Sequence, residues 1–237
     1  MRVLDCTLRD GGYYTNWDFD PDLVDTYLET MSALNVPLIE IGYFGNDFSR
    51  YYGQYYYVTD GLLESVRARL GPGQQVGVMV NFKEYTAESL DARLSRTGVL
   101  PNFIRIAVPI SEIDGAVELA DVIRGHGIAC GLNFMYMSRY WDDVDSIGAL
   151  SRAAHVDYVS LVDSYGSCYP DQVKAAVTEL SRVLPDTTLG FHGHNNLELA
   201  HANALAAEQA GCEVLDATML GIGRGAGNLR TEIIMLR

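Results

Sequence analysis

Short apolar runs alternate along the chain with segments in which apolar residues recur at helical spacing. The runs predict eight strands, at residues 2–8, 37–43, 75–81, 103–108, 127–134, 156–162, 187–193 and 213–218. Several intervening segments begin at a helix-start signal, for example Asp20-Pro21 and Thr86 with Ser89 three residues later. Regular alternation of strands and helices predicts parallel strands joined by right-handed crossovers.

Eight strand–helix units within 237 residues favour an α/β protein, a (β/α)8 TIM barrel of parallel strands that takes up residues 1–237 as a single domain. An open doubly wound sheet is the alternative, but the GxGxxG turn that would favour it does not follow the first predicted strand. In a barrel, functional side chains lie at the carboxyl ends of the strands. We therefore expect the site in the loops that follow the strands.

Composition and charge narrow the function classes. The formal net charge is −14 and the 17 basic residues are scattered, so a nucleic-acid partner is not expected. The chain has no long apolar run and no basic and apolar leader at its start, so we expect neither a membrane partner nor secretion. The four cysteines form no CxxC pair and indicate neither a zinc knuckle nor a disulfide framework. The resulting expectation is a soluble cytoplasmic protein, with assembly into a homo-oligomer left open.

The strongest chemical signal is His192-Gly-His194, at the end of the seventh predicted strand. Residues two apart in a strand face the same side, so both imidazoles can reach one point. Asp10 follows the first predicted strand and would complete a set of two nitrogens and one oxygen, which leaves positions open on a divalent metal ion. The tripeptide alone could arise by chance. Asp163 and Asn228 follow the sixth and eighth predicted strands, however, so all these polar groups fall on one rim of the barrel.

A metal ion at this rim can act as a Lewis acid toward a 2-oxo acid, and carbon–carbon bond chemistry beside the ketone passes through an enolate. Arg9 is the cation placed to stabilise the enolate oxygen, and a structural salt bridge is its alternative role. Tyr13 is a candidate acid–base group, although a phenol needs a lowered pKa or a water relay for this task. Asn228 is either a fourth, weak metal ligand or the cap of the final helix.

Three further residues are predicted to bind substrate: Asp163, Tyr14 and Asn133. Asp163 would orient Arg9 or a ligand histidine, and an ordinary turn residue is the alternative. Tyr14 places a second phenol beside the predicted metal site, next to Tyr13.

Two loops differ from the rest of the chain. Residues 44–59 contain five of the 15 tyrosines, which is compatible with a lid over the rim, a subunit interface or simple packing. The glycines of residues 221–227 allow tight turns and could cradle an anion. A Walker-type sequence is missing there, so we favour a rim turn that positions Asn228.

The segments Thr7-Leu-Arg-Asp-Gly11, His192-Gly-His194-Asn195 and Gly221-Ile-Gly-Arg-Gly-Ala-Gly-Asn228 together resemble the HMG-CoA lyase-like family, the DRE-TIM metallolyases. The resemblance covers nearly the whole chain and is greatest to the 4-hydroxy-2-oxovalerate aldolase branch. It implies that Asp10, His192 and His194 bind Mn2+ or Mg2+, with Zn2+ or Co2+ as further options. It also implies that Arg9 stabilises the enolate and that Asn228 is a ligand, as in some members.

The chain departs from the family pattern at several positions. Tyr13 stands where the aldolase branch usually has a histidine acid–base group. Gly11-Gly12-Tyr13 replaces the Gly-Glu-Gln of the Claisen-condensing synthases, and the cysteine-bearing glycine loop of the CoA-thioester lyases is not evident. A chain ending at Arg237 is not expected to include the C-terminal helical domain with which bacterial aldolases dock an aldehyde dehydrogenase. The resemblance therefore indicates the class of chemistry more firmly than the substrate.

The leading prediction is a divalent-metal-dependent aldolase or lyase that makes or breaks a carbon–carbon bond next to a 2-oxo acid. Its substrate would be a 4-hydroxy-2-oxo acid or, in the reverse direction, pyruvate and an aldehyde. A Claisen-type acyl-CoA condensing transferase of the same superfamily is one alternative, and a non-catalytic barrel module of a pathway complex is the other.

Overall fold

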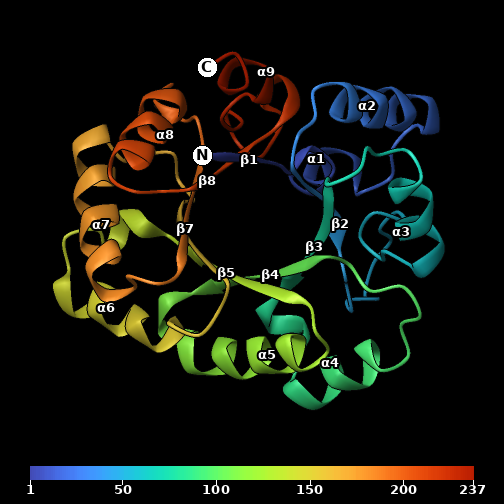
Figure 1. Cartoon of the computed structure of the whole chain (residues 1–237), viewed down its shortest axis with the longest axis horizontal. Coiled ribbons are helices and arrows are strands. Elements are labelled where there is room, and N and C mark those ends of the chain that lie inside the picture. Colours follow the sequence, from blue (N-terminus) through green and yellow to red (C-terminus); the bar gives the residue numbers. More distant parts are fainter.

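The strands of the computed structural model, which describes all residues from 1 to 237, close into one parallel barrel in chain order. They are β1 (Arg2–Asp5), β2 (Leu38–Tyr43), β3 (Gln75–Asn81), β4 (Phe103–Pro109), β5 (Ala129–Met135), β6 (Tyr158–Asp163), β7 (Thr188–Gly193) and β8 (Val214–Ala217). β1 pairs with both β2 and β8, so the first and last strands complete the ring. Figure 1 shows this ring of strands with the helices around its outside. The predicted (β/α)8 TIM barrel is confirmed.

The helices around the barrel begin where the sequence signals predict. Asp20 accepts hydrogen bonds from two backbone N–H groups at the start of α2 (Pro21–Ala33), whose first residue is proline. Thr86 and Ser89 form a reciprocal capping box at the start of α4 (Ala87–Leu94). The other α-helices are α1 (Thr7–Thr15), α3 (Asp60–Arg67), α5 (Ile113–Gly125), α6 (Val144–Ala149), α7 (Pro170–Val183), α8 (Ala200–Gln209) and α9 (Thr231–Ile234). Short 3-10 helices span Phe82–Glu84, Ile110–Glu112, Met137–Arg139, Leu150–Ala153 and Met219–Gly221. No helix has both the length and the apolar character that crossing a membrane requires.

The first strand is shorter than predicted, and a helix replaces its second half. The sequence predicts a strand over residues 2–8, but β1 ends at Asp5 and α1 begins at Thr7. The Asp5 carboxylate accepts a hydrogen bond from the Thr7 backbone N–H, which turns the chain into the helix. Leu8 is buried in α1, so the apolar run continues across the turn, and a short apolar run does not distinguish a strand from a helix. Asp10 accordingly lies in the first turn of α1.

The interior of the barrel carries an apolar layer and then a charged layer along the strands. Three residues of β2, β4 and β8 belong to a small apolar cluster that is separate from the main core: Leu38, Phe103 and Val214. Two positions further along the same strands, and thus on the same face, lie three charged residues that are at most 1% exposed: Glu40, Arg105 and Asp216. The residues between them belong to the main core, between the barrel and its helices: Ile39, Ile104 and Leu215. The charged layer lies on the side of the carboxyl ends, where a site is expected.

Residues 44–59 pack as an aromatic loop between the end of β2 and α1. Tyr52, Tyr55 and Tyr56 are at most 6% exposed. The rings of Tyr52 and Tyr56 meet the Trp17 ring edge-on, with centroids 5.2 and 4.9 Å away. Simple packing therefore accounts for these tyrosines. Two aromatic residues of this loop remain exposed: Phe48 and Tyr51.

Candidate metal-binding active site

Four predicted residues meet at the carboxyl end of the barrel, although they come from opposite ends of the chain. Asp10 lies in α1, His192 belongs to β7 and His194 follows it directly, and Asn228 lies between β8 and α9. One nitrogen of each histidine and one oxygen of Asp10 lie within 4.8 Å of one another, and all three residues are buried. Asn228 donates its amide N–H to Asp10, and its backbone forms a β-bridge with His194. The structure thus assembles the set that the sequence predicts, while its binding of a metal stays a prediction.

The polar atoms of this set fit a divalent cation. His194 Nδ1 and Asn228 Oδ1 are buried and have no hydrogen-bond partner in the protein. A buried polar atom without a partner costs about 1–3 kcal/mol, so a ligand that satisfied these atoms would stabilise the arrangement. Imidazole nitrogens together with carboxylate and amide oxygens form a mixed donor set that suits Mn2+, Mg2+ or a related ion.

The protonation states at the site also favour a cation. Burial lowers the pKa of His194 to about 4, and the neighbouring His192 adds to this effect, so His194 is neutral at neutral pH. Burial alone would raise the pKa of Asp10, but the charge of the Arg9 guanidinium, with further contributions that include the hydrogen bond from Asn228, outweighs it and holds this pKa below its usual range. A neutral imidazole and an ionised carboxylate are the forms that bind metal ions.

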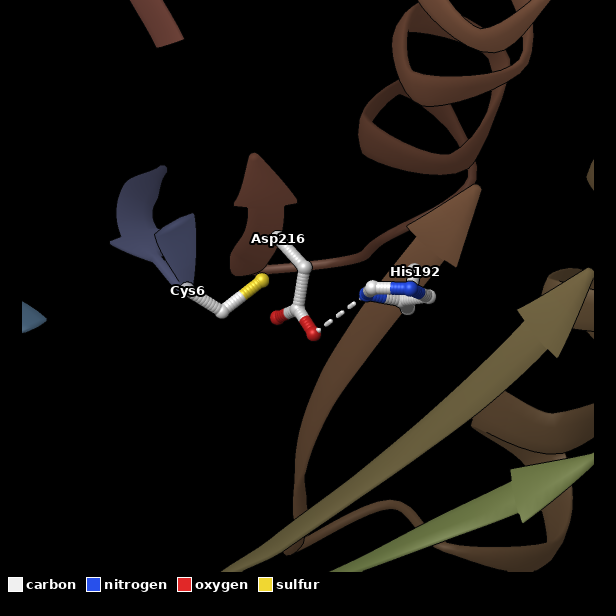
Figure 2. Close-up of side chains that lie close together, drawn as sticks. All are labelled: Cys6, His192 and Asp216. Atoms are coloured by element: carbon white, nitrogen blue, oxygen red, sulfur yellow. Dashed lines mark hydrogen bonds and ion pairs between the residues drawn. The ribbon is translucent and has the colours of Figure 1, made fainter. Parts of the chain in front are cut away.

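A carboxylate from the neighbouring strand holds His192 in place. His192 Nδ1 lies 2.9 Å from Asp216 Oδ2, and His192 Nε2 lies 3.7 Å from Asp10 Oδ2. Figure 2 shows the Asp216 carboxylate, from β8, directed at the His192 ring. Because this hydrogen bond occupies Nδ1, it fixes the ring and leaves Nε2 for a ligand on the Asp10 side.

Cys6 also lies near Asp216 and His192, and these three residues bring a second group of metal-ligating atom types together (Figure 2). The Cys6 Sγ contacts the carbonyl oxygen of Ala217 at 3.5 Å. Burial raises the pKa of the Cys6 thiol well above its usual value, so the thiol stays protonated. Asp216 already accepts two hydrogen bonds from Arg105. Two members of this group are therefore already engaged within the protein: the Cys6 thiol with the Ala217 carbonyl and the Asp216 carboxylate with Arg105.

A continuous chain of buried charges runs from the site across the barrel. Arg9 donates from Nε to Glu40 at 2.7 Å and from Nη1 to Asp10 at 2.6 Å. Arg105 donates to Glu40 at 2.7 and 2.9 Å, and its Nη1 reaches both oxygens of Asp216 at 2.9 and 2.7 Å. Arg105 therefore connects Glu40, which holds Arg9, with Asp216, which holds His192.

Three residues that complete this chain were not predicted from the sequence: Glu40, Arg105 and Asp216. Each is a single charge in an apolar strand segment, namely Leu38-Ile-Glu-Ile41, Phe103-Ile-Arg-Ile106 and Val214-Leu-Asp-Ala217. A buried charge is costly unless it is paired, so charges of opposite sign in predicted interior strands indicate mutual partners. That signal was present in the sequence.

A cavity at the rim gives access to the set. Its wall includes Arg9, His192, His194 and Asn133. Asn133 is buried on β5 and its Oδ1 has no partner in the protein, so an acceptor is available to a bound ligand. Arg9 Nη2 forms no hydrogen bond within the protein, whereas Nε and Nη1 do. The predicted roles of Arg9 and Asn133 are compatible with these positions.

Tyr13 and Tyr14 lie at the mouth of the site but make different contacts. Tyr13 lines the cavity, and its hydroxyl is 3.2 Å from the hydroxyl of Tyr43. The Tyr14 hydroxyl donates to the carbonyl oxygen of Gly225 at 3.2 Å and so ties α1 to the glycine loop. A contact of Tyr14 with substrate stays a prediction.

Asp163 binds backbone groups rather than the residues it was predicted to orient. Its two carboxylate oxygens accept hydrogen bonds from the N–H groups of Ser167 and Cys168, at 3.1 and 3.0 Å. The side chain is fully buried and does not contact Arg9 or a histidine ring through a hydrogen bond. An ordinary turn residue makes contacts of this kind, and they fix the loop after β6.

The glycine loop returns Asn228 to the rim. The Asn228 N–H donates to the Gly221 carbonyl oxygen at 2.9 Å, which closes the loop. A Cβ on Gly223 would lie 2.5 Å from the Asn228 side chain, so glycine is required for this close approach. The helix α9 begins at Thr231 with Arg230 as its N-cap, so Asn228 is not the cap of the final helix. The rim-turn interpretation of this loop agrees with the structure.

Sequence comparisons identify relatives over the full chain. The model of the HMGL-like family matches residues 108–237. A protein named oxaloacetate decarboxylase from Mycobacterium tuberculosis is 30% identical over 237 residues, which cover 98% of this chain and 68% of that protein. A protein named 4-hydroxy-2-oxovalerate aldolase from Thermomicrobium roseum is 30% identical over 236 residues, with 98% and 65% coverage. The chain spans about two thirds of the length of these relatives.

A solved structure shares the fold over the whole chain. It is the N-terminal domain of a protein assigned as an aldolase from Bacteroides vulgatus, with a TM-score of 0.93, 37% identity, and coverage of 100% of this chain and 78% of that one. The sequence relatives carry the names of lyase-type enzymes, which confirms the predicted enzyme class. With a family match over more than half of its residues and relatives along its full length, the chain belongs to the HMGL-like family.

Proposed function

We propose that the chain is a divalent-metal-dependent aldolase, which cleaves a 4-hydroxy-2-oxo acid to pyruvate and an aldehyde or catalyses the reverse reaction. The observation that carries the proposal is the convergence of Asp10, His192 and His194 beside a cavity lined by Arg9. These three residues, with Asn228, would hold the cation. When bound, the cation would supply Lewis-acid polarisation of the 2-oxo group.

Arg9 is the residue that we assign to the developing enolate oxygen. Cleavage breaks the C3–C4 bond of the substrate, and its electron pair moves onto C3 and the 2-oxo oxygen. Glu40 and Asp10 fix the guanidinium through Nε and Nη1, and Nη2 remains free to donate. A donor that is already oriented stabilises the new negative charge without rearrangement.

Tyr13 is the residue that we assign to the C4 hydroxyl of the substrate. This hydroxyl must lose its proton as C4 becomes the carbonyl carbon of the aldehyde. Burial raises the pKa of Tyr43 well above its usual value, so Tyr43 keeps its proton and can donate a hydrogen bond to the Tyr13 oxygen 3.2 Å away. That bond would hold the Tyr13 oxygen in a fixed position at the cavity, where it can exchange a proton with the substrate.

The test is the cleavage of 4-hydroxy-2-oxovalerate by protein loaded with Mn2+, with pyruvate and acetaldehyde measured separately. We expect equal amounts of the two products, loss of the reaction in EDTA and recovery on return of Mn2+. Metal-loaded protein that releases pyruvate from no 4-hydroxy-2-oxo acid would contradict the proposal.

Decarboxylation of oxaloacetate is a second candidate, supported by the relative of that name. The C3–C4 bond again breaks and its electron pair again forms an enolate, but the leaving group is CO2 and no hydroxyl proton is removed. Parallel measurement of CO2 from oxaloacetate and aldehyde from the hydroxy acid separates the two candidates.

A Claisen-type acyltransferase and a non-catalytic barrel module gain no support from the named relatives, which are an aldolase and a decarboxylase. Release of free thiol from acetyl-CoA in the presence of a 2-oxo acid would favour the acyltransferase. Protein purified without chelator that held no metal and bound none would favour the non-catalytic module.

A further inference from the structure

Arg224 lies in the glycine loop, beside the cavity of the proposed active site. Its guanidinium stands over the Tyr13 ring, with Cζ 5.0 Å from the ring centroid. It shares the cavity wall with Arg9 and His194. The residue is exposed, and its side chain forms neither an ion pair nor a hydrogen bond within the protein. A positive charge without an acidic partner therefore stands at the mouth of the cavity.

The two buried arginines of the site differ from Arg224 in this respect. Arg9 and Arg105 are each paired with two carboxylates. The whole chain carries a net charge of −14, so acidic partners are plentiful on its surface. A guanidinium binds a carboxylate through two parallel hydrogen bonds. All the hydrogen-bond donors of the Arg224 guanidinium are thus free to bind an anion that comes from outside the protein.

The backbone around Arg224 is fixed next to α1. The Tyr14 hydroxyl donates to the carbonyl oxygen of Gly225 at 3.2 Å, and the Gly227 N–H donates to the carbonyl oxygen of Arg224 at 3.1 Å. Because α1 also carries Tyr13, these contacts hold the backbone of Arg224 beside the helix whose Tyr13 ring lies under the guanidinium. Arg224 is therefore a built part of the cavity mouth.

We infer that Arg224 binds a second carboxylate on the substrate, so that the preferred substrates are 4-hydroxy-2-oxo dicarboxylic acids. The inference rests on the proposed aldolase function, which assigns Tyr13 to the C4 hydroxyl. Since Arg224 stands over the Tyr13 ring, a carboxylate attached to C4 lies next to the guanidinium. Cleavage of C3–C4 then passes the hydroxyl proton to the Tyr13 oxygen, and Tyr13 gives up this proton, directly or through water, to C3 of the enolate, which becomes pyruvate. The other product is an aldehyde that bears the carboxylate, such as glyoxylate.

The first test compares 4-hydroxy-2-oxoglutarate with 4-hydroxy-2-oxovalerate, which differ only by a carboxylate in place of a methyl group. We expect the wild-type kcat/KM to be at least about tenfold higher for the dicarboxylate, because charge-assisted hydrogen bonds are strong. Arg224→Gln should lower this ratio by roughly ten- to a hundredfold, mainly through KM for the dicarboxylate. Any loss for the monocarboxylate should be smaller than the loss for the dicarboxylate by this factor, and Arg224→Lys should recover part of the preference.

The second test measures binding without turnover. Calorimetry with Mn2+ present compares 2-oxoglutarate with 2-oxopentanoate, a pair that differs by the same exchange of carboxylate for methyl. The wild type should bind 2-oxoglutarate more tightly, and Arg224→Gln should remove the difference. Arg182→Gln is the matched control, because Arg182 is an exposed arginine on α7 that pairs with Glu179 away from the cavity.

The two tests distinguish failure of this inference from failure of the proposed function. If the wild type cleaves both hydroxy acids with equal kcat/KM and Arg224→Gln leaves the ratio unchanged, the inference is wrong and the aldolase function stands. If neither acid is cleaved, the aldolase function fails, and the calorimetric comparison alone tests whether Arg224 binds a carboxylate. A preference for 2-oxoglutarate that Arg224→Gln removes then supports the anion site, and equal affinities overturn it.

Discussion

The side chains of the proposed site owe their orientation to specific neighbours. His192 is directed by Asp216, and Arg9 is held between Asp10 and Glu40. His194 differs, because its Nδ1 is buried without a partner. Substitutions of single residues therefore separate metal binding from the chemical steps.

His192→Ala should abolish Mn2+ binding measured by calorimetry, because it removes one of two nitrogen donors from a set of three residues. The circular dichroism spectrum should not change, since His192 lies at the end of β7 on the functional rim. His201→Ala, on the exposed side of α8, is the control that keeps its affinity. Full affinity in His192→Ala would show that the metal site has been assigned wrongly.

Arg9→Lys should fold and bind metal but lose about a hundredfold in enolisation, the size of effect expected from removal of one oxyanion donor. Lysine keeps the charge but lacks the planar fork that binds Glu40 and Asp10 together. Deuterium exchange into the methyl group of pyruvate measures this step directly. Exchange at the wild-type rate would remove Arg9 from the mechanism.

Tyr13→Phe should abolish cleavage of 4-hydroxy-2-oxo acids, because the proton of the C4 hydroxyl then lacks its acceptor. Oxaloacetate decarboxylation requires no such acceptor and should persist if the enzyme catalyses it. Tyr51→Phe, an exposed residue of the 44–59 loop, is the control. Cleavage by Tyr13→Phe at the wild-type rate would assign the proton to another group, such as a metal-bound water.

At the scale of elements, the site depends on how strands and helices are joined. The ion pairs of Arg105 connect β4 with β2 and β8 inside the barrel. On the rim, α1 is joined to the segment after β8 through Tyr14 and through Thr7, whose Oγ1 accepts a hydrogen bond from the Met219 N–H at 2.8 Å. Gly12 lets the Trp17 ring pack directly against α1, since a Cβ there would lie 2.1 Å from this ring.

Arg105→Met should destabilise the protein by about 3–5 kcal/mol, because it removes the arginine partner of the buried Asp216 carboxylate and leaves Glu40 with Arg9 alone. The free energy of unfolding in urea measures the change. Arg124→Met is the matched control, because Arg124 and Asp157 form a pair with side chains 41% and 40% exposed, worth about 0–1 kcal/mol. Equal effects of the two substitutions would mean that the buried chain of charges does not stabilise the barrel.

The strands, most of the helices and the rim that carries the site could be predicted from the sequence, because they follow from the spacing at which apolar residues recur. Because His192, His194 and Asn228 lie at or after the ends of predicted strands, they fall on the same rim of the barrel whatever the exact strand boundaries are. The helix α1 was missed because Leu8 extends the apolar run of β1 past the turn at Asp5. The ion pairs of the barrel interior were missed because residues far apart in sequence meet only when the barrel is closed.

At the scale of the whole molecule, the buried ionisable groups make stability depend on pH. His194 has a pKa of about 4 in the folded protein, below its usual value of about 6.5. Between these values the unfolded chain binds a proton that the folded protein does not, so falling pH favours unfolding. The pKa values of Asp10 and Asp216 are also lowered in the folded protein, so the same trend continues at lower pH.

The free energy of unfolding of the metal-free protein should therefore fall as the pH decreases from about 6.5 to 4, and it should fall further in stronger acid. Urea unfolding at a series of pH values in EDTA measures the trend. His194→Asn should remove the part of this decrease in stability that occurs between pH 6.5 and 4. A wild-type stability that stayed constant over this interval would contradict the assignment of a neutral, buried His194.

The hydrogen bond between Asn228 and Asp10 joins residues 218 positions apart, and this separation determines when the site can form during synthesis. At about 5–20 residues per second, a ribosome needs on the order of ten to forty seconds to pass from one residue to the other. For most of that interval the nascent chain carries Arg9 and Asp10 without the histidines, and the barrel stays open until β8 has been made. A cation that binds at this site could therefore not guide the early stages of folding, because the full set of residues exists only after translation has passed residue 228.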